Sequence, residues 1–409
     1  MSTLSTTGTA NDRAFSRIVR RAPRWVGVAP AREVLGLAER VLLHAGPPLI
    51  DSTHPPQAMR NAAVLACLHE GWAADEAAAG QLIQRGEVRL EPGSTHRIST
   101  PLVSLVSAST TLAIIDAGEL AASARWYGFL GTGGGAQMRF GALDHAIIGR
   151  LKFREHTLQP GFAALLEAGP VDLLAIARAG LTEGDDLHNR LSSATQVLHA
   201  VLASRRIDTP AAQAALVTIL EAPLYFLNLW MPACALMLDG AVGEAGSSLV
   251  TRFGANGEQI ALQIAGLPER WFSGPATLVR GPFMKGAPDN PQFPPVTGDS
   301  GIIDLFGLGG QVLHRAPSLL SAFTPWLAAD DAARAKALLC GMHPVLGVAV
   351  GVDAAAVVAS GRTPLLSTGM VSADGRGLLG RGLCDVPASP FIEAVAALSR
   401  SALDSPTSC

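Results

Sequence analysis

The spacing of apolar and polar residues along the chain predicts a helical middle part between two mixed parts. From about 143 to 240, Leu and Ala recur at i, i+3 and i+4, which is the period of an amphipathic helix. On both sides, helical segments alternate with short strand-like runs. The pattern predicts a multi-domain α/β (α+β) protein with a flexible tail at 1–14, an N-terminal α/β domain at 15–142, a helical middle domain at 143–240 and a C-terminal α/β domain at 241–409.

Individual elements of the N-terminal part are predicted by local patterns. Residues 31–43 begin with helical spacing and continue into a short buried strand. Residues 57–85 are rich in Ala and predict two helices around Gly71. Residues 87–92 alternate as a strand does, and 100–116 predict a strand, a loop and a second strand.

The C-terminal part is predicted to be built from hairpins and one long loop. Asn256-Gly257 lies between two alternating runs, which is a strong signal for a β-hairpin. The Pro/Gly-rich stretch 279–300 is long for a connection without structure, and such loops are often functional. Three further segments follow: a buried strand at 345–352, a helix that ends at Gly361 and a strand at 364–371, with a glycine-spaced turn at 375–382.

Composition and charge exclude several classes of protein. Of 409 residues, 48% are hydrophobic and 16% charged, and the net charge is −3, so neither a disordered chain nor a basic nucleic-acid groove is expected. The low charge leaves little polar cover, and we therefore expect a homo-oligomer that buries part of the surface. The five cysteines form no C-x-x-C pair, so no disulfide framework, metal cluster or cofactor is expected from their spacing.

The sequence offers no candidate for membrane insertion or export. The first 14 residues contain no apolar core of a signal peptide. The apolar run 222–238 is short and is interrupted by Asn228, Pro223 and Pro232, so it predicts a buried helix rather than a membrane span. We expect a cytoplasmic protein that contacts neither membrane nor nucleic acid.

The sharpest candidate for chemistry is the run Gly184-Asp185-Asp186-Leu187-His188-Asn189-Arg190, at the expected start of a long helix. Asp185 and His188 are three residues apart and can share a helix face, where the carboxylate would make the imidazole more basic. The guanidinium of Arg190 suits a carboxylate or phosphate. The alternative is a capped helix start with ordinary surface charges.

A second group of candidates could bind an anion through backbone amides. Asp299 and Ser300 begin a predicted helix, whose free N–H groups could hold an oxyanion. Gly133 and Gly134, in a glycine run near Arg139, could form an anion nest. Ordinary helix capping and close packing of glycines are the alternatives.

Other polar residues are weaker candidates. His44 ends a predicted strand, and strand ends often line clefts, although a lone histidine is usually structural. Further anion-site candidates are Ser367-Thr368-Gly369, after a buried strand, and Arg376 and Arg381 in the glycine-spaced turn. The basic patch Arg17, Arg20, Arg21 and Arg24 around Trp25 predicts a solvated face, a subunit contact or an anion site. The aromatic pair in Arg270-Trp271-Phe272-Ser273-Gly274-Pro275 predicts core or interface residues or a stacking platform. Together the candidates favour a small anionic substrate.

Nine motifs, in the same order along about 15–400, resemble the YlbE/AllG family of the bacterial allantoin-utilisation locus. They are LLHAGPP, EGWAADEAAA, MRFGA, GDDLHNR, FLNLWM, GSSLVTRFGANGEQIALQIAG, RWFSGP, GDSGIIDLFGLGG and PLLSTGMVSADGRGLLGRG. The resemblance implies an α/β fold with a helical middle domain. It also implies a complex with an FdrA-like protein and a third small subunit, which together resemble oxamate carbamoyltransferase.

The implied reaction interconverts oxalurate plus phosphate with oxamate plus carbamoyl phosphate. For this chemistry we expect His188, paired with Asp185, to act as acid and base. We expect Arg190 and Arg139 to hold the anions, and the Asp299–Ser300 amides to hold a phosphate or carbonyl oxygen.

The chain departs from the family pattern at three places, and two other functions remain open. The departures are Ser99-Thr100-Pro101-Leu102-Val103 in place of a glycine-rich turn, Asp304 as the acidic residue after the G-D-S motif, and Leu191 after Arg190. One alternative is a non-catalytic scaffold for an FdrA-like protein. The other is a hydrolase of another small ureido or amide acid, which would need no phosphate.

Overall fold

The computed structural model describes residues 9–118, 125–328 and 331–404. Its helices are α1 Ala10–Arg20, α2 Ala31–Leu35, α3 Gln57–His69, α4 Glu76–Gln84, α5 Ala146–Phe153, α6 Gln159–Glu167, α7 Leu173–Thr182, α8 Ser192–Ala203, α9 Pro210–Leu220, α10 Leu227–Asp239, α11 Ile302–Phe306, α12 Pro317–Phe323, α13 Asp331–Leu338, α14 Ala354–Ser360 and α15 Ser389–Asp404. Its strands are β1 Arg24–Pro30, β2 Val41–His44, β3 Arg89–Pro92, β4 Ile98–Ser99, β5 Thr111–Asp116, β6 Arg125–Phe129, β7 Val171–Asp172, β8 Val250–Asn256, β9 Gln259–Ile264, β10 Leu267–Pro275, β11 Thr297–Gly298, β12 Leu339–Met342, β13 Ala349–Val352, β14 Leu365–Val371 and β15 Leu378–Asp385. The mixture of helices and strands confirms the predicted α/β class.

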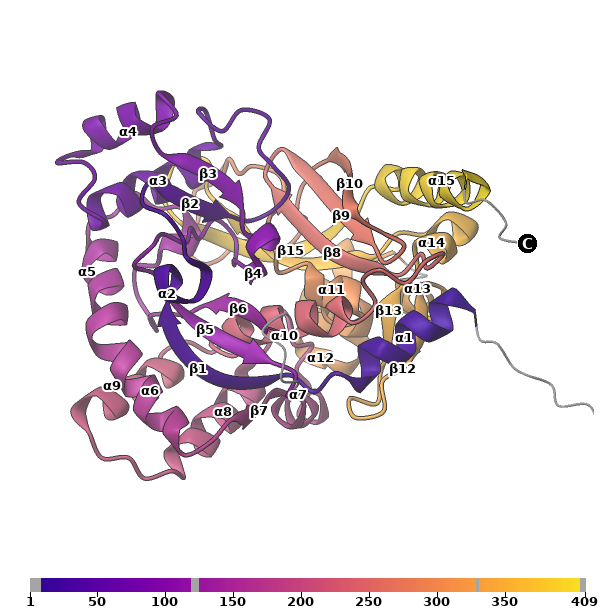
Figure 1. The fold of residues 1–409 in the computed structure, drawn as a ribbon, viewed down its shortest axis with the longest axis horizontal. Coiled ribbons are helices and arrows are strands. Elements are labelled where there is room, and N and C mark those ends of the chain that lie inside the picture. The colour runs from indigo at the N-terminus through magenta and orange to yellow at the C-terminus, as the bar shows by residue number, and fades with distance from the viewer. Residues whose placement is uncertain (1–8, 119–124, 329–330, 405–409) are drawn as a thin grey trace, which may run out of the picture.

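A five-stranded sheet with the order β4-β6-β5-β1-β7 organises the N-terminal part. Its long pairs β1·β5 and β5·β6 are antiparallel. Helices α5 to α9 from the middle of the chain gather beside this sheet, and α6 packs against β1 (Figure 1). The helices expected between 143 and 240 are therefore present, while the boundaries of the predicted domains stay predictions.

Helix α10 lies against strands β5 and β6 and connects this sheet to the C-terminal part. Pro232 lies inside the helix and has no N–H for the carbonyl of Asn228. A side chain on Gly128 of β6 would collide with that carbonyl, so the glycine lets strand and helix approach closely. The prediction of a buried helix within 222–238 is confirmed, because every residue of α10 is buried.

The C-terminal part contains the predicted hairpin and a second, unexpected strand pair. Strands β8 and β9 pair in antiparallel fashion around Gly257, whose φ is 88°, within the sheet β10-β9-β8-β11. The expected turn at 375–382 is wrong for most of its length, because Leu378 begins strand β15, which pairs with β14. The alternation of glycine with larger residues suits a strand whose neighbours approach closely; Gly382, for example, lies against the backbone of Arg280.

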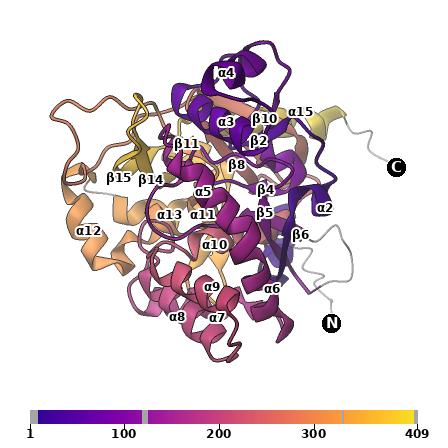
Figure 2. The same cartoon turned by 90° about the vertical axis from the view of Figure 1, so that its left-hand side faces the viewer.

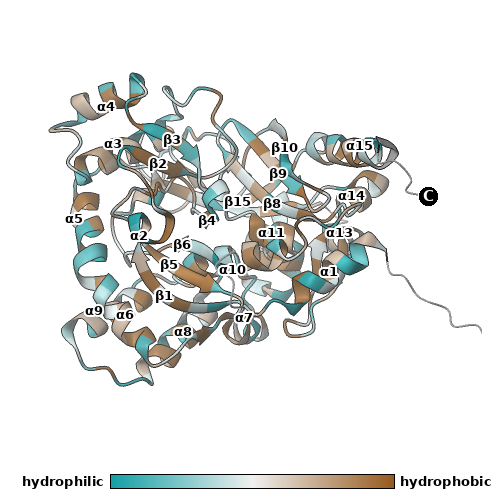
Figure 3. Cartoon of the chain, in the orientation of Figure 1, coloured by the Kyte–Doolittle hydropathy of each residue, from teal (hydrophilic) through white to brown (hydrophobic). Residues whose placement is uncertain are grey.

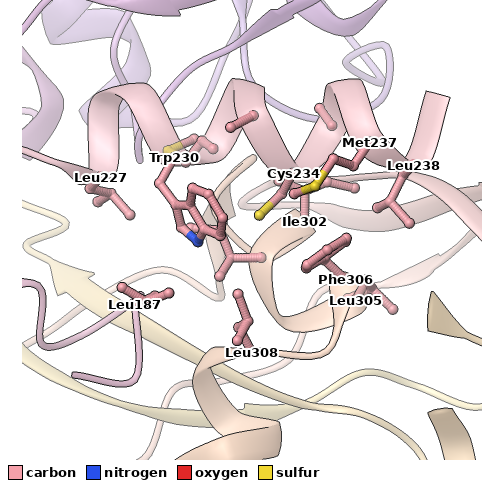
Figure 4. Close-up of a cluster of buried hydrophobic side chains, with 14 of the residues drawn as sticks. Leu187, Leu227, Trp230, Cys234, Met237, Leu238, Ile302, Leu305, Phe306 and Leu308 are labelled. Carbon is pink, nitrogen blue, oxygen red and sulfur yellow. The ribbon is translucent and has the colours of Figure 1, made fainter. Parts of the chain in front are cut away.

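One buried hydrophobic cluster extends from Ala14 to Ala397 and includes side chains of all three predicted parts. In Figure 4, Trp230 of α10 faces Leu187 and Leu308, and Trp230 also stacks on Phe226 with ring centroids 5.6 Å apart. Apolar residues concentrate on β1, β5 and α11 (Figure 3). This shared core holds the loops of the candidate site described below against α10.

The predicted N-terminal tail is partly helical. Helix α1 begins at Ala10, with Thr9 as its cap, so residues 10–14 of the predicted tail are helical. Its buried side chains, Ala14 and Ile18, join the large core. Within the described ranges, no helix is long and apolar enough to cross a membrane. Figure 2 shows α12, β14 and β15 on one side of the molecule and α15 on the other.

Leu238→Ala should lower the free energy of unfolding by about 3 kcal/mol, because Leu238 is fully buried in the cluster of Figure 4 and the change leaves a cavity. Leu220→Ala, the same substitution at a side chain that is 53% exposed on α9, is the matched control and should cost well under about 1 kcal/mol. Denaturant unfolding of both variants measures the difference. Equal losses would contradict the central place of α10 in the core.

Candidate active site

Residues 183–191 form the loop between α7 and α8 rather than the first turn of a helix. The predicted helix start is therefore displaced to Ser192. Asp185 caps that helix, since its carboxylate accepts the Ala194 N–H at 2.8 Å, and it also accepts Arg190 Nη1 at 2.9 Å. The expected pairing of Asp185 with His188 is wrong, because the Asp185 carboxylate is already engaged by the helix end and by Arg190.

Asp186 gives this loop its shape. Its Oδ1 accepts the backbone N–H groups of His188, Asn189 and Arg190 at 3.0, 2.9 and 2.8 Å. Leu187 between them has a φ of 63°, a left-handed conformation that is strained for a leucine. Strained backbone held by buried hydrogen bonds is frequent at functional sites. The next two residues, His188 and Asn189, both line the pocket described below.

The partner of His188 is Asp304, on the short helix α11. His188 Nδ1 and Asp304 Oδ2 are 2.7 Å apart, and both side chains are buried. Burial by itself would lower the pKa of His188, but the charge and hydrogen bond of Asp304, with a smaller contribution from Asp186, outweigh it and raise that pKa above its ordinary value. Nε2 is then the nitrogen of His188 that a ligand can use.

Asp304 is itself held by the backbone around it. Its Oδ1 accepts the N–H of Gly310 at 2.7 Å and that of Ser367 at 3.1 Å. Gly309, with a φ of 53°, passes so close that a side chain there would overlap Asp304 and His188. The Gly309 N–H also donates to the Asp186 carbonyl at 2.9 Å, so the segments 183–191 and 302–310 form one unit. The FGLGG motif thus permits backbone to pack directly on the pair.

His188 faces a small pocket, which we call the dyad pocket. Its cavity is about 50 Å³. A cavity needs only roughly 10–15 Å³ to hold one ordered water, so this space suits one compact ligand. The lining residues come from seven short stretches of the chain: Pro101, Leu102, Arg139, Phe140, His188, Asn189, Leu224, Leu227, Ser300, Thr368, Gly369, Leu378 and Arg381. Pro101 and Leu102, where a departure from the family pattern was expected, form part of its apolar wall.

Two guanidinium groups give the dyad pocket its charge. Arg381 Nη1 donates to the carbonyl of Asn189 at 2.9 Å, and the Arg139 guanidinium lies 4.7 Å from the centre of the Phe140 ring. Burial of that guanidinium, together with repulsion from Arg381, lowers the pKa of Arg139 to about 10. Two cations that repel each other in a confined space favour binding of an anion between them.

Buried polar atoms of the pocket also lack partners. Among the described residues, Arg139 Nε and Thr368 Oγ1 are buried without a hydrogen bond. Such atoms carry a substantial desolvation cost unless a ligand or water satisfies them. A bound acid could accept from both, which agrees with the charge of the pocket. Sequence patterns had singled out Arg139, Ser300, Thr368 and Arg381. Asn189 belonged to the candidate run 184–190 but was given no role, because an asparagine in a polar run carries no distinguishing signal.

Two predicted binding residues lie outside this pocket. Asp299 accepts the Gly46 N–H at 2.7 Å and the Thr100 N–H at 3.2 Å, so it ties two loops together, and its own N–H donates to the Thr100 carbonyl. The Asp299 amide is thus not available for an oxyanion. Burial raises the pKa of Asp299 to about 7, against the hydrogen bonds from Gly46 and Thr100. His44 is buried, with Nδ1 2.7 Å from the Ala45 carbonyl, and burial lowers its pKa to about 4.

The glycine run and Arg190 are also engaged elsewhere. Arg150 donates to the carbonyl of Gly134 at 2.6 Å, and the Gly134 N–H points to the Glu221 carboxylate at 3.4 Å. A side chain on Gly133 would collide with Glu221, so the expected nest is filled by a carboxylate of the chain itself. Arg190 donates to Asp185 and to the Glu183 carbonyl, and it does not line the dyad pocket.

Within residues 9–118, 125–328 and 331–404, no three His, Cys, Asp or Glu side chains lie so that they could hold a metal ion. Cys67, Cys234, Cys340 and Cys384 are free thiols. The groups that the dyad pocket offers a ligand are therefore an imidazole, two guanidinium groups, hydroxyls and an amide.

Comparison with known proteins identifies similar chains. Residues 88–300 match the family described as oxamate carbamoyltransferase subunit AllG. The chain is 33% identical to the Escherichia coli (strain K12) protein named oxamate carbamoyltransferase subunit AllG, over 96% of this chain and 97% of that protein. It is 29% identical to the uncharacterized protein YahG of the same strain, over 94% of this chain and 84% of that protein.

A solved structure also resembles the fold described above. It is the crystal structure of a conserved protein of unknown function from Enterococcus faecalis V583, with a TM-score of 0.89 at 25% sequence identity. The match covers 96% of this chain and 97% of that chain. The similarities therefore extend over the pocket as well as over the surrounding fold.

Proposed function

Because this chain belongs to the family of oxamate carbamoyltransferase subunit AllG, we propose that its dyad pocket binds the compact acid of a carbamoyl transfer between carbamoyl phosphate and oxamate. The observation that supports this most strongly is the His188–Asp304 pair, at 2.7 Å, beside Arg139 and Arg381. The arrangement combines a base with two anion-binding groups, and this reaction requires both.

In the proposed reaction, Arg139 and Arg381 hold the carboxylate of oxamate. Its amide nitrogen attacks the carbonyl carbon of carbamoyl phosphate and loses a proton to His188 Nε2. The new C–N bond forms, the bond from the carbonyl carbon to the phosphate oxygen breaks, and inorganic phosphate leaves. In the opposite direction, His188 returns the proton to the nitrogen as phosphate attacks oxalurate. Asp304 stabilises the imidazolium and keeps its ring in place.

We also propose that the chain acts within a complex. The similar Escherichia coli protein is named a subunit. The cavity of about 50 Å³ has room for one compact ligand rather than for two substrates and a departing phosphate. An FdrA-like protein and a third small subunit are the partners that we expect to complete the site.

The test is an assay of phosphate release from carbamoyl phosphate with oxamate as the acceptor. The chain is measured alone and together with an FdrA-like protein and the third small subunit. We expect oxamate-dependent phosphate release from the assembled complex and little from any single component. Amide hydrolysis by this chain alone, without phosphate or carbamoyl phosphate, would contradict the proposal.

The pH dependence of kcat/KM should report on His188. The imidazole must be neutral to accept a proton, so the rate should fall as the pH drops through its raised pKa. Asp304→Asn removes the charge that raises this pKa, and the acid limb should move to lower pH while the plateau rate also falls. Asp172→Asn, at a helix cap outside the pocket, is the control and should not change the pH at which kcat/KM falls on the acid side. An unchanged limb in Asp304→Asn would rule out His188 as the titrating base.

A further inference from the structure

A second cavity, which we call the arginine cleft, is lined in part by Arg252 of β8 and Gln263 of β9. Its volume is about 440 Å³, several times that of the dyad pocket. The two cavities share no lining residue. The cleft is lined by Arg21, Ser94, Thr95, Arg97, Asp239, Val242, Arg252, Gln263, Pro268, Glu269 and Trp271. It is therefore a separate feature of the molecule.

Three arginines from distant segments converge on the arginine cleft. Arg21 follows α1, Arg97 precedes β4, and Arg252 lies on β8. Burial lowers the pKa of Arg252, and the nearby charges of Arg97 and Arg21 lower it further, against the opposing charge of Asp239. The three guanidinium groups are thus close enough to repel one another.

The acidic groups of the cleft only partly balance this charge. Asp239 is buried and is already paired with Arg252, whose guanidinium lies 4.7 Å from the centre of the Trp126 ring. Glu269 is exposed. The chain as a whole carries a net charge of −3, so the positive charge here is local. A local excess of arginine within a cavity is what recognition of a phosphate requires.

Two polar atoms of the cleft are buried and unsatisfied. Among the described residues, Arg21 Nη1 and Ser94 Oγ are buried without a hydrogen-bond partner. Arg97, which adjoins the short 3-10 helix Gly93–His96, has a φ of 56°, and a left-handed arginine is a strained conformation. Ligand oxygens could satisfy both orphan atoms, and the strain at Arg97 is typical of a residue held in position for binding.

We propose that the arginine cleft is a second anion-binding site, which takes a phosphate-bearing small molecule. Arg21, Arg97 and Arg252 hold the phosphate, and Trp271 offers its indole to a flat part of the same ligand. The cleft offers such a molecule about 440 Å³, against about 50 Å³ in the dyad pocket. This proposal does not depend on the carbamoyl-transfer function, since it involves none of the residues of the dyad pocket.

The test is isothermal titration of the purified full-length chain with phenyl phosphate and with inorganic phosphate. We expect phenyl phosphate to bind at this cleft more tightly than inorganic phosphate. Arg21→Gln should weaken both by about tenfold or more, because it removes a charge-assisted hydrogen bond. Trp271→Ala should remove the preference for phenyl phosphate and leave inorganic phosphate binding unchanged.

Matched controls separate this site from general charge effects and from the dyad pocket. Arg20→Gln makes the same charge change at an exposed neighbour that does not line the cleft, and it should bind as the wild type does. Arg139→Gln, which alters the dyad pocket instead, should also bind phenyl phosphate at the arginine cleft as the wild type does. Equal affinity in the Arg21→Gln and Arg20→Gln chains would overturn the proposal. Loss of phenyl phosphate binding in Arg139→Gln alone would also overturn it, because the binding would then belong to the dyad pocket.

Discussion

His188→Gln should lower kcat/KM for carbamoyl transfer by about a thousandfold in the assembled complex, because glutamine can fill the position but cannot accept a proton. The reasoning rests on the 2.7 Å contact with Asp304, which orients the ring and leaves Nε2 to the dyad pocket. Steady-state kinetics of phosphate release, with oxamate as the varied substrate, measures the effect. The loss should be in kcat, since the proton moves only during the reaction.

A second histidine provides the control for this substitution. His199 lies on α8, in the helix that follows the site loop, and does not line the dyad pocket. His199→Gln should keep kcat/KM within about twofold. Activity of His188→Gln within a few fold of the wild type would exclude His188 as the base, and the dyad would then have a structural role.

Arg139→Gln should raise the KM for oxamate by about tenfold to a hundredfold, because a buried charged hydrogen bond to the substrate carboxylate is lost. Arg139 is suited to this role because its Nε is buried without a partner among the described residues. Arg139→Lys should recover only part of the affinity, since lysine keeps the charge but not the planar fork. Initial rates at varied oxamate concentration separate KM from kcat.

Two other arginines test whether the effect of Arg139 is specific. Arg178→Gln, at an exposed position of α7, should leave the KM unchanged. Arg190→Gln should reduce stability rather than substrate affinity, because Arg190 is bonded to Asp185 and the Glu183 carbonyl. A larger rise in KM for Arg190→Gln than for Arg139→Gln would reverse the assignment of the anion-binding residues.

Secondary structure was predictable where the local pattern and the tertiary environment agree. The hairpin at Gly257 requires a positive φ that glycine supplies, and the mostly apolar segment of α10 has no stable place except a core. The turn expected at 375–382 was wrong because glycines signal turns locally, while strand β15 uses them to let backbones approach. Only the neighbouring backbone distinguishes these two uses.

In the candidate site, the sequence identified binding residues but not the residues that contact them in space. Sequence patterns selected His188, Arg139 and Ser300 from three distant segments, and all three line the dyad pocket. They could not select the partner of His188, because Asp185 is near it in sequence while Asp304 is near it in space. Spacing along a helix ranks local partners first, and a loop with a left-handed Leu187 does not follow helical spacing.

By itself the sequence determined the α/β class, the family, most of the elements and the chemical types available for binding an acid, because these depend on local periodicity and on residue identity. The tertiary structure alone decided which carboxylate serves His188 and which glycines carry close packing rather than turns. It also decided that Arg21, Arg97 and Arg252 meet in one cleft. Those outcomes depend on contacts between segments far apart in the chain, where burial and hydrogen-bond satisfaction select one partner among several that the sequence permits.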